Sequence, residues 1–99
     1  MTETPAEYAP LDIVGIAMKS DAIDALTSPL EFAIASEDPW VVNAGILAIG
    51  HAARRFKAYP SGLKDALWAR IHDFPQAEQL RSACLTAQDD IRHFKAKPV

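Results

Sequence analysis

The most constraining feature of this sequence is an apolar segment that begins directly after Asp38-Pro39 and continues to about residue 57. An acidic residue followed by proline is typical of a helix start, because the side chain caps free amide groups and proline fits the first helical position. Apolar side chains then recur at helical spacing in two stripes. The larger side chains are Val42, Ile46, Ile49, Ala53 and Phe56, and the smaller ones are Val41, Ala44, Gly45, Ala48 and Ala52. We therefore predict a central helix over about 39–57, buried on two sides and closely approached by a neighbour.

Shorter helices are expected around this segment. Ser28-Pro29-Leu30-Glu31 has the form of a capping box and predicts a helix to about Ser36, after one or two helical turns in residues 21–27. Ser61 is expected to cap a helix to about His72, and a last helix is expected over about 76–95. Its inner face would hold Ala77, Leu80, Cys84, Ala87, Ile91 and Phe94. The apolar pattern of residues 11–18 leaves helix and strand open, with a helix favoured by its context.

Length and composition agree with a small helical domain. The chain has 99 residues, of which 49% are hydrophobic and 18 are alanine, a strong helix former. This predicts one compact all-α domain of about four to six helices over residues 11–99. Residues 1–10 contain two prolines and several acids, and we expect them to form a flexible N-terminal arm.

Charge is divided unevenly along the chain. Residues 1–40 carry eight acids and one base, whereas residues 41–99 carry five acids and nine bases. A dipolar domain of this kind fits a charged partner better than a polyanion that covers its whole surface. The single cysteine, the missing signal-peptide pattern and the absence of a long apolar run favour a cytoplasmic protein with no membrane segment.

The central segment resembles the second helix of a HEAT repeat. That helix typically has an acidic cap followed by Val-Arg-x-Ala-Ala-x-Ala-Leu-Gly, and the sequence DPWVVNAGILAIG follows the pattern over residues 38–50. The matching positions are Val42, Gly45, Ile46, Ala48, Ile49 and Gly50. Asn43 stands where an arginine is usual, so the ladder between repeats that this arginine often supports lacks its usual residue. The resemblance implies a HEAT-like arrangement of helical pairs.

Two further stretches are similar to very small bacterial HEAT-like proteins. These proteins carry a Gly-His-x-Ala-Arg run, as in residues 50–54, and end in an Ala-x-Asp-Asp-Ile-x-x-Phe helix, as in residues 83–94. Some of them serve as immunity proteins beside polymorphic or contact-dependent growth inhibition toxins. The resemblance implies a protein that binds and neutralises the C-terminal domain of a cognate toxin. A nuclease is one kind of toxin that it would neutralise.

Candidate partner-binding residues follow from charge and from the enrichment of tryptophan at binding hot spots. They are Glu31, Glu37, Asp38, Trp40, Asp89 and Asp90. Three of them have a structural alternative: Trp40 can pack in the core, and the Asp89-Asp90 pair can lie on a solvated face or neutralise Arg54 or Arg55 from the central helix. Acidic residues suit a partner that must be basic to hold a phosphate backbone, as a nuclease must.

No pattern points to catalysis. The three histidines lack metal-ligand spacing, Cys84 has no histidine three or four residues away to activate it, and no phosphate loop is present. We therefore expect no enzyme activity, no cofactor and no metal. Two alternatives stay open beside an immunity protein: a general HEAT-like interaction module, and a nucleic-acid binder that uses Arg54, Arg55, Lys57, Lys64 and Arg70. Nucleic acid is the less favoured partner, because the bases are few.

Overall fold

The computed structural model describes residues 8–99, and this part of the chain holds five α-helices. The α-helices are α1 (Pro10–Lys19), α2 (Thr27–Ala35), α3 (Pro39–Phe56), α4 (Ser61–Arg70) and α5 (Ala77–His93). Two short 3₁₀ helices, η1 (Ile23–Leu26) and η2 (Ile71–Asp73), and two strands, β1 (Ala58–Tyr59) and β2 (Lys97–Pro98), complete the described elements. The predicted all-α fold of four to six helices is confirmed, and residues 11–18 are helical.

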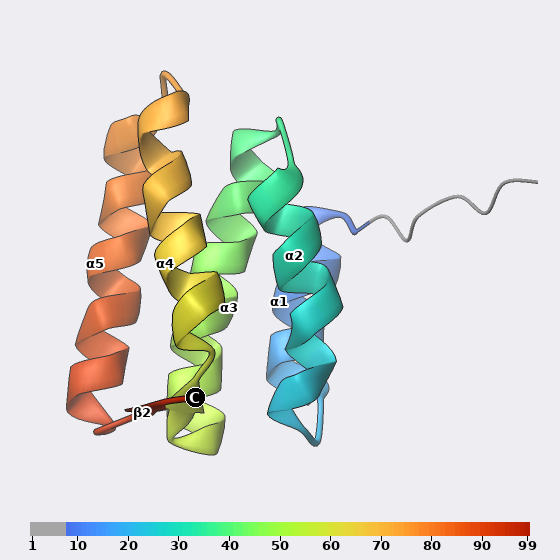
Figure 1. Cartoon of the computed structure of the whole chain (residues 1–99), viewed down its shortest axis with the longest axis vertical. Helices are drawn as coiled ribbons and strands as arrows, with labels where there is room; N and C mark the ends of the chain where they lie inside the picture. Colours follow the sequence, from blue (N-terminus) through green and yellow to red (C-terminus); the bar gives the residue numbers. More distant parts are fainter. Residues whose placement is uncertain (1–7) are drawn as a thin grey trace, which may run out of the picture.

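Successive helices run in alternating directions. They form two layers, with α2 and α4 in one layer and α1, α3 and α5 in the other (Figure 1). α3 packs against α1 on one side and α5 on the other, and α2 and α4 contact both α3 and each other. Short connections explain this order, because they place consecutive helices antiparallel to one another. The result is a pair of stacked helical hairpins, α2–α3 and α4–α5, with α1 at one edge of the layer that contains α3.

The central helix is buried on two sides, as its two stripes predicted. Asp38 caps it by accepting a hydrogen bond from the Trp40 amide at 2.9 Å, and Pro39 is its first residue. Gly45 allows α2 to approach closely, since a Cβ added there would lie 2.8 Å from Cβ of Ala33. Ten residues of α3 are buried: Val41, Val42, Ala44, Gly45, Ile46, Ala48, Ile49, Gly50, Ala52 and Ala53.

Two predicted helix caps are wrong. η1 continues directly into α2, which begins at Thr27, so Ser28 lies inside the first helical turn instead of before it. Its hydroxyl lies 3.1 Å from the Tyr8 hydroxyl. Ser61 is likewise the first residue of α4 and not its cap, and its hydroxyl donates to the Val99 carbonyl at 3.2 Å.

The end of the chain pairs with the connection between α3 and α4. α5 ends at His93, two residues earlier than predicted, and β2 then lies parallel to β1, with Ala58 opposite Lys97 and Tyr59 opposite Pro98 (Figure 1). The Lys97 amide donates to the Lys57 carbonyl at 3.0 Å, and the Val99 amide donates to Tyr59 at 2.9 Å. The sequence pattern did not predict this pairing.

Basic side chains donate hydrogen bonds to free carbonyl groups at the C-terminal ends of three helices. Arg55 donates to the Ala17 carbonyl at the end of α1, and Arg70 donates to the Ile34 carbonyl at the end of α2. Lys57 donates to the Arg54 carbonyl at the end of α3. Carbonyl groups in a last helical turn have no helical partner and carry the negative end of the helix dipole, so cations are favourable there. Arg55 and Arg70 also join neighbouring helices.

Residues 1–7 of the predicted N-terminal arm lie outside the described residues. Tyr8 packs edge-on against Phe32 with 5.6 Å between ring centroids, and α1 begins at Pro10. Asp12 in its first turn accepts a hydrogen bond from the Ala9 amide at 2.9 Å.

Candidate protein-interaction site

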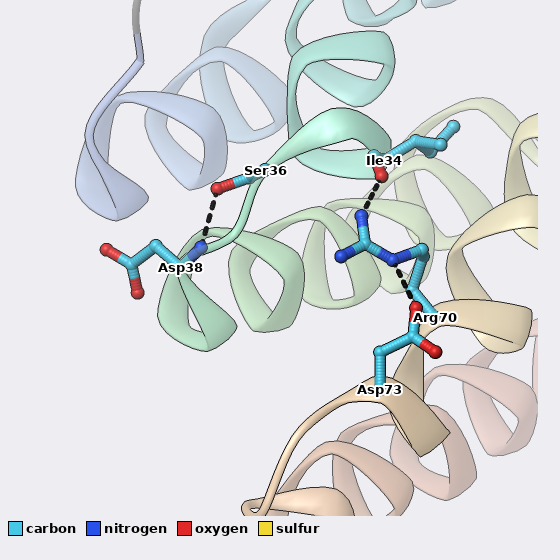
Figure 2. Close-up of polar contacts among 5 residues, drawn as sticks. All are labelled: Ile34, Ser36, Asp38, Arg70 and Asp73. Carbon is cyan, nitrogen blue, oxygen red and sulfur yellow. Dashed lines mark hydrogen bonds and ion pairs between the residues drawn. The ribbon is translucent and has the colours of Figure 1, made fainter.

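The turn between α2 and α3 and the first turn of α3 hold three of the six predicted partner-binding residues. Ser36 Oγ accepts a hydrogen bond from the Asp38 amide at 3.0 Å, while the Asp38 carboxylate caps α3 (Figure 2). Glu37 is exposed between them, and Trp40 follows in the first turn of the helix. The local sequence therefore determines the geometry of the turn through two side chain–backbone hydrogen bonds.

Arg70 supports this turn from α4. Its guanidinium donates one hydrogen bond to the Ile34 carbonyl, directly before the turn, and its Nε donates to the Asp73 carboxylate at 2.7 Å (Figure 2). The Cζ atom of the same guanidinium lies 5.1 Å from the centroid of the Phe74 ring. Arg70 therefore links the end of α2 to the end of α4, which limits movement of the turn.

Trp40 is 49% exposed, although tryptophan usually buries most of its large surface. Glu37 and Asp38 are also exposed, and Glu31 is exposed on α2. An indole with acidic neighbours on a fixed backbone presents both an apolar anchor and negative charge to a partner. We call Glu37, Asp38 and Trp40 the α2–α3 turn surface.

Asp90 belongs to a different environment. Its carboxylate lies 3.1 Å from Nε of Arg54, and only 16% of its side chain is exposed. Of the two predicted pairing partners, Arg54 is confirmed, while Arg55 bonds the Ala17 carbonyl instead. Gly50 provides the space for this pair, because a Cβ there would lie 2.9 Å from the Asp90 carboxylate. The geometry gives Asp90 an internal role between α3 and α5.

Asp89 points away from this pair. Its side chain is 77% exposed and lies 3.9 Å from Arg92 in the next helical turn. Arg54 follows Trp40 by 14 residues on α3, which corresponds to about 21 Å along a helix. The structure therefore brings Glu37, Asp38 and Trp40 together and leaves Asp89 and Asp90 near the other end of α3. The six residues do not form one surface.

The five bases considered for nucleic-acid binding all make contacts within the chain. Arg54 pairs with Asp90, and Arg55, Lys57 and Arg70 bond helix-end carbonyls. Lys64 lies 3.2 Å from Asp65 and 5.1 Å from the Trp68 ring centroid. Trp68 is partly buried and packs against the core. Arg54, Lys64 and Arg70 are paired with carboxylates, so less unpaired positive charge is left than the sequence alone implied.

The potential catalytic groups have environments that fit structural roles. Burial, followed by the nearby Arg54 charge, lowers the pKa of His51, and Asp90 opposes this effect. Burial raises the pKa of Cys84 to about 11, so the group is a thiol at neutral pH. Among residues 8–99, histidine, cysteine and carboxylate side chains form no cluster of three that would hold a metal ion.

Arg55 and Arg70 are the residues whose roles the sequence reasoning missed. The sequence offers both as candidate nucleic-acid contacts, and Arg55 also as a partner of the Asp89-Asp90 pair, yet each donates to a carbonyl more than thirty-five residues away in the chain. Their position in the last turn of α3 and of α4 is the only sequence signal, because it is where basic side chains favour a helix. That signal points to their own helix end and not to a neighbour's.

No helix in residues 8–99 has both the length and the apolar character needed to cross a membrane. Comparison of the chain with protein-family models, with curated proteins and with solved structures gave no match.

Proposed function

We propose that this protein is an immunity protein that binds a cognate toxin domain in the cytoplasm and covers the active site of that domain. The observation that carries the proposal is the half-exposed Trp40 beside Glu37 and Asp38 on a turn supported by Arg70. The similarity of residues 50–54 and 83–94 to small HEAT-like immunity proteins supports the same function.

Each part of the α2–α3 turn surface has a physical role in such a complex. Trp40 is the anchor, because a large rigid side chain buries much apolar area with little loss of conformational freedom. Glu37 and Asp38 attract a basic partner, and a nuclease toxin has the basic surface that they would recognise. The hydrogen bonds of Ser36, Asp38 and Arg70 lower the entropy lost on binding, since the turn is already ordered.

The mechanism is occlusion and needs no chemistry from the immunity protein. A rigid surface that fills the entrance to the toxin's active site excludes substrate for as long as the complex lasts. Tight binding then depends mainly on slow dissociation, which a well-packed anchor provides.

The direct test is co-expression with a candidate toxin domain, taken from the C-terminus of any large secreted protein whose gene adjoins the gene for this chain. We expect protection of growing cells and a one-to-one complex by calorimetry. The Trp40→Ala variant should weaken binding by roughly 2 kcal/mol, about thirtyfold in Kd, if Trp40 is a hot spot. Leu85→Ala is the matched control, because Leu85 is 57% exposed on α5, away from the turn.

Failure of the wild-type chain both to bind and to protect contradicts the immunity function. Binding without protection favours the second candidate, a general interaction module that uses the same turn surface. Equal weakening by Trp40→Ala and Leu85→Ala would exclude the turn as the centre of the interface. Micromolar binding to duplex or single-stranded nucleic acid that falls steeply with salt would favour a nucleic-acid binder instead.

A further inference from the structure

We propose that two copies of this chain associate through the outer face of α1, with the two α1 helices antiparallel and crossing at Gly15. This interface uses none of the residues of the α2–α3 turn surface, so the proposal does not depend on the immunity function.

One side of the outer face of α1 is apolar, where a helix at the edge of a layer would normally be polar. Ile13 and Ala17 bury the inner side of α1 against the rest of the fold. Leu11 is 84% exposed and Met18 is 55% exposed on the opposite side. α1 lies at the edge of the layer formed with α3 and α5, so no other helix of residues 8–99 covers its outer face (Figure 1). Adding a helix there would continue the layer.

Gly15 is at the centre of this outer face. Side chains rotate by about 100° per residue around a helix, which places Gly15 opposite the midpoint of Ile13 and Ala17. Among residues 8–99, a Cβ built on Gly15 would meet nothing within 4 Å. The fold of one chain therefore does not require glycine here, although glycine lowers helix stability by about 1 kcal/mol relative to alanine. Close approach of a second backbone would require it.

Charged and apolar residues lie on separate sides of Gly15. By the same rotation, Asp12 and Lys19 lie about 60° and about 40° to one side, while Leu11 and Met18 lie about 40° and about 60° to the other. In each pair, one residue precedes Gly15 and the other follows it by a similar distance along the helix. When two copies of α1 lie antiparallel, the first half of one helix is therefore complementary to the second half of the other.

An antiparallel two-fold arrangement uses this complementarity twice. A two-fold axis through the crossing point reverses the helix direction but keeps each side of the helix on the same side of the pair. Asp12 of one copy then lies opposite Lys19 of the second copy, and Leu11 lies opposite Met18. Both contacts occur twice by symmetry. A groove lined by Tyr8, Asp12, Gly15, Ile16 and Lys19 runs beside this face and receives the second helix.

A parallel arrangement of the same helices lacks these contacts. A two-fold axis along the helices moves the charged side of one copy to the apolar side of the other, so Asp12 would not face Lys19. The positions of the charged and apolar residues therefore favour an antiparallel second copy of this chain as the occupant of this face.

The first test is the molar mass of the full chain across a wide concentration range, measured by sedimentation equilibrium. We expect reversible dimers. Gly15→Gln adds bulk at the crossing point and should raise the dimer dissociation constant about tenfold or more, without lowering the Tm, because glutamine is a better helix former than glycine. Gly62→Gln is the matched control, since a Cβ at Gly62 also meets nothing within 4 Å. It should leave the mass unchanged.

The second test uses charge reversal and mixing. Asp12→Lys and Lys19→Glu each place like charges opposite one another in their own dimers, so each variant alone should associate weakly. In an equimolar mixture, Lys at position 12 of one chain meets Glu at position 19 of the other, and the wild-type Lys19 meets the wild-type Asp12. We expect the mixture to form dimers that neither variant forms alone.

A wild-type chain that stays monomeric at all concentrations overturns the proposal and leaves this face to a different occupant. A dimer that Gly15→Gln and Gly62→Gln affect equally also overturns it, because association then uses another surface. Failure of the mixed variants to recover dimers overturns the antiparallel arrangement.

Discussion

The Arg54 guanidinium on α3 pairs with the Asp90 carboxylate on α5 in the space that Gly50 leaves between the two helices. Such a pair holds α3 and α5 in register as well as neutralising charge. Asp89 and Asp90 are both candidate partner-binding residues, but only Asp90 has this internal contact. Asp89 is exposed. The two neighbouring aspartates therefore serve as a matched pair for mutation.

We expect Asp90→Ala to lower the free energy of unfolding by about 1 kcal/mol, because Arg54 stays half-exposed and keeps part of its hydration. Asp89→Ala should change it by less than about 0.5 kcal/mol, as is usual for an exposed position. Urea denaturation measures both values. Equal effects of the two variants would contradict an internal role for Asp90.

Gly45 and Gly15 should respond in opposite ways to the same added methyl group. At Gly45 the new Cβ would overlap Cβ of Ala33, which cannot rotate away, so α2 must move. We expect Gly45→Ala to destabilise the fold by roughly 1–3 kcal/mol, as overpacking does. Gly15→Ala should instead stabilise the monomer by up to about 1 kcal/mol. Thermal melts at low concentration compare them, and stabilisation by Gly45→Ala would show that α2 does not approach α3 as described.

His51 should make stability depend on pH near the histidine range. Its pKa is lowered in the folded state, so the unfolded chain binds more protons between that pKa and about 6.5. Stability therefore rises with pH through this window and is lost as the pH falls. We expect His51→Gln to reduce the pH dependence of the urea midpoint between about pH 5 and about pH 7.5.

His72→Gln is the control for this measurement, because His72 is exposed on η2. An unchanged pH dependence in His51→Gln would assign the effect to other groups. The same conclusion would follow if stability fell less with decreasing pH in His72→Gln than in His51→Gln.

Cys84 should resist thiol reagents in the folded protein. It is 3% exposed, and burial raises its pKa to about 11, so both access and thiolate content are low at neutral pH. We expect slow reaction with a disulfide reagent under native conditions and fast reaction in denaturant, followed by absorbance. Comparable rates in the two conditions would contradict the burial of Cys84.

Arg70, whose side chain is only 19% exposed, should contribute to the stability of the fold. Arg70→Gln removes the donor to Ile34 and the pair with Asp73, and we expect a loss of roughly 1–2 kcal/mol in unfolding free energy. Arg92→Gln is the control, since the Arg92 side chain is 80% exposed. Hydrogen exchange of the Glu37 and Asp38 amides should increase only in Arg70→Gln, and no increase would show that Arg70 does not support the turn.

Helix positions could be predicted because they depend on local sequence. Asp38-Pro39 marks the start of α3 correctly, and the stripe from Val42 to Phe56 identifies its buried side. The capping box at Ser28 failed because η1 extends into α2, and a tertiary contact with Tyr8 takes the Ser28 hydroxyl. Local patterns cannot include such a contact, since it depends on how distant segments pack.

The candidate site was predictable only in part. The Asp38 cap follows from the Asp38-Pro39 pair, and the pairing of Asp90 with Arg54 is one of the two alternatives that the sequence left open. The bonds of Arg55 and Arg70 to backbone carbonyls could not be predicted, because every residue has a carbonyl and no sequence pattern distinguishes Ala17 or Ile34 as the acceptor. The separation of Trp40 from Asp89 along α3 also required the structure.

The pairing of β1 with β2 has a consequence for the order of folding. Lys57 and Lys97 are joined through two intervening helices, so their contact closes a long loop at an entropic cost that grows with its length. Two residues of strand offer few hydrogen bonds in return, and α4 and α5 must already be in place. The last strand is therefore expected to attach late and to detach first, which allows the C-terminal end to open and close while the five helices remain folded.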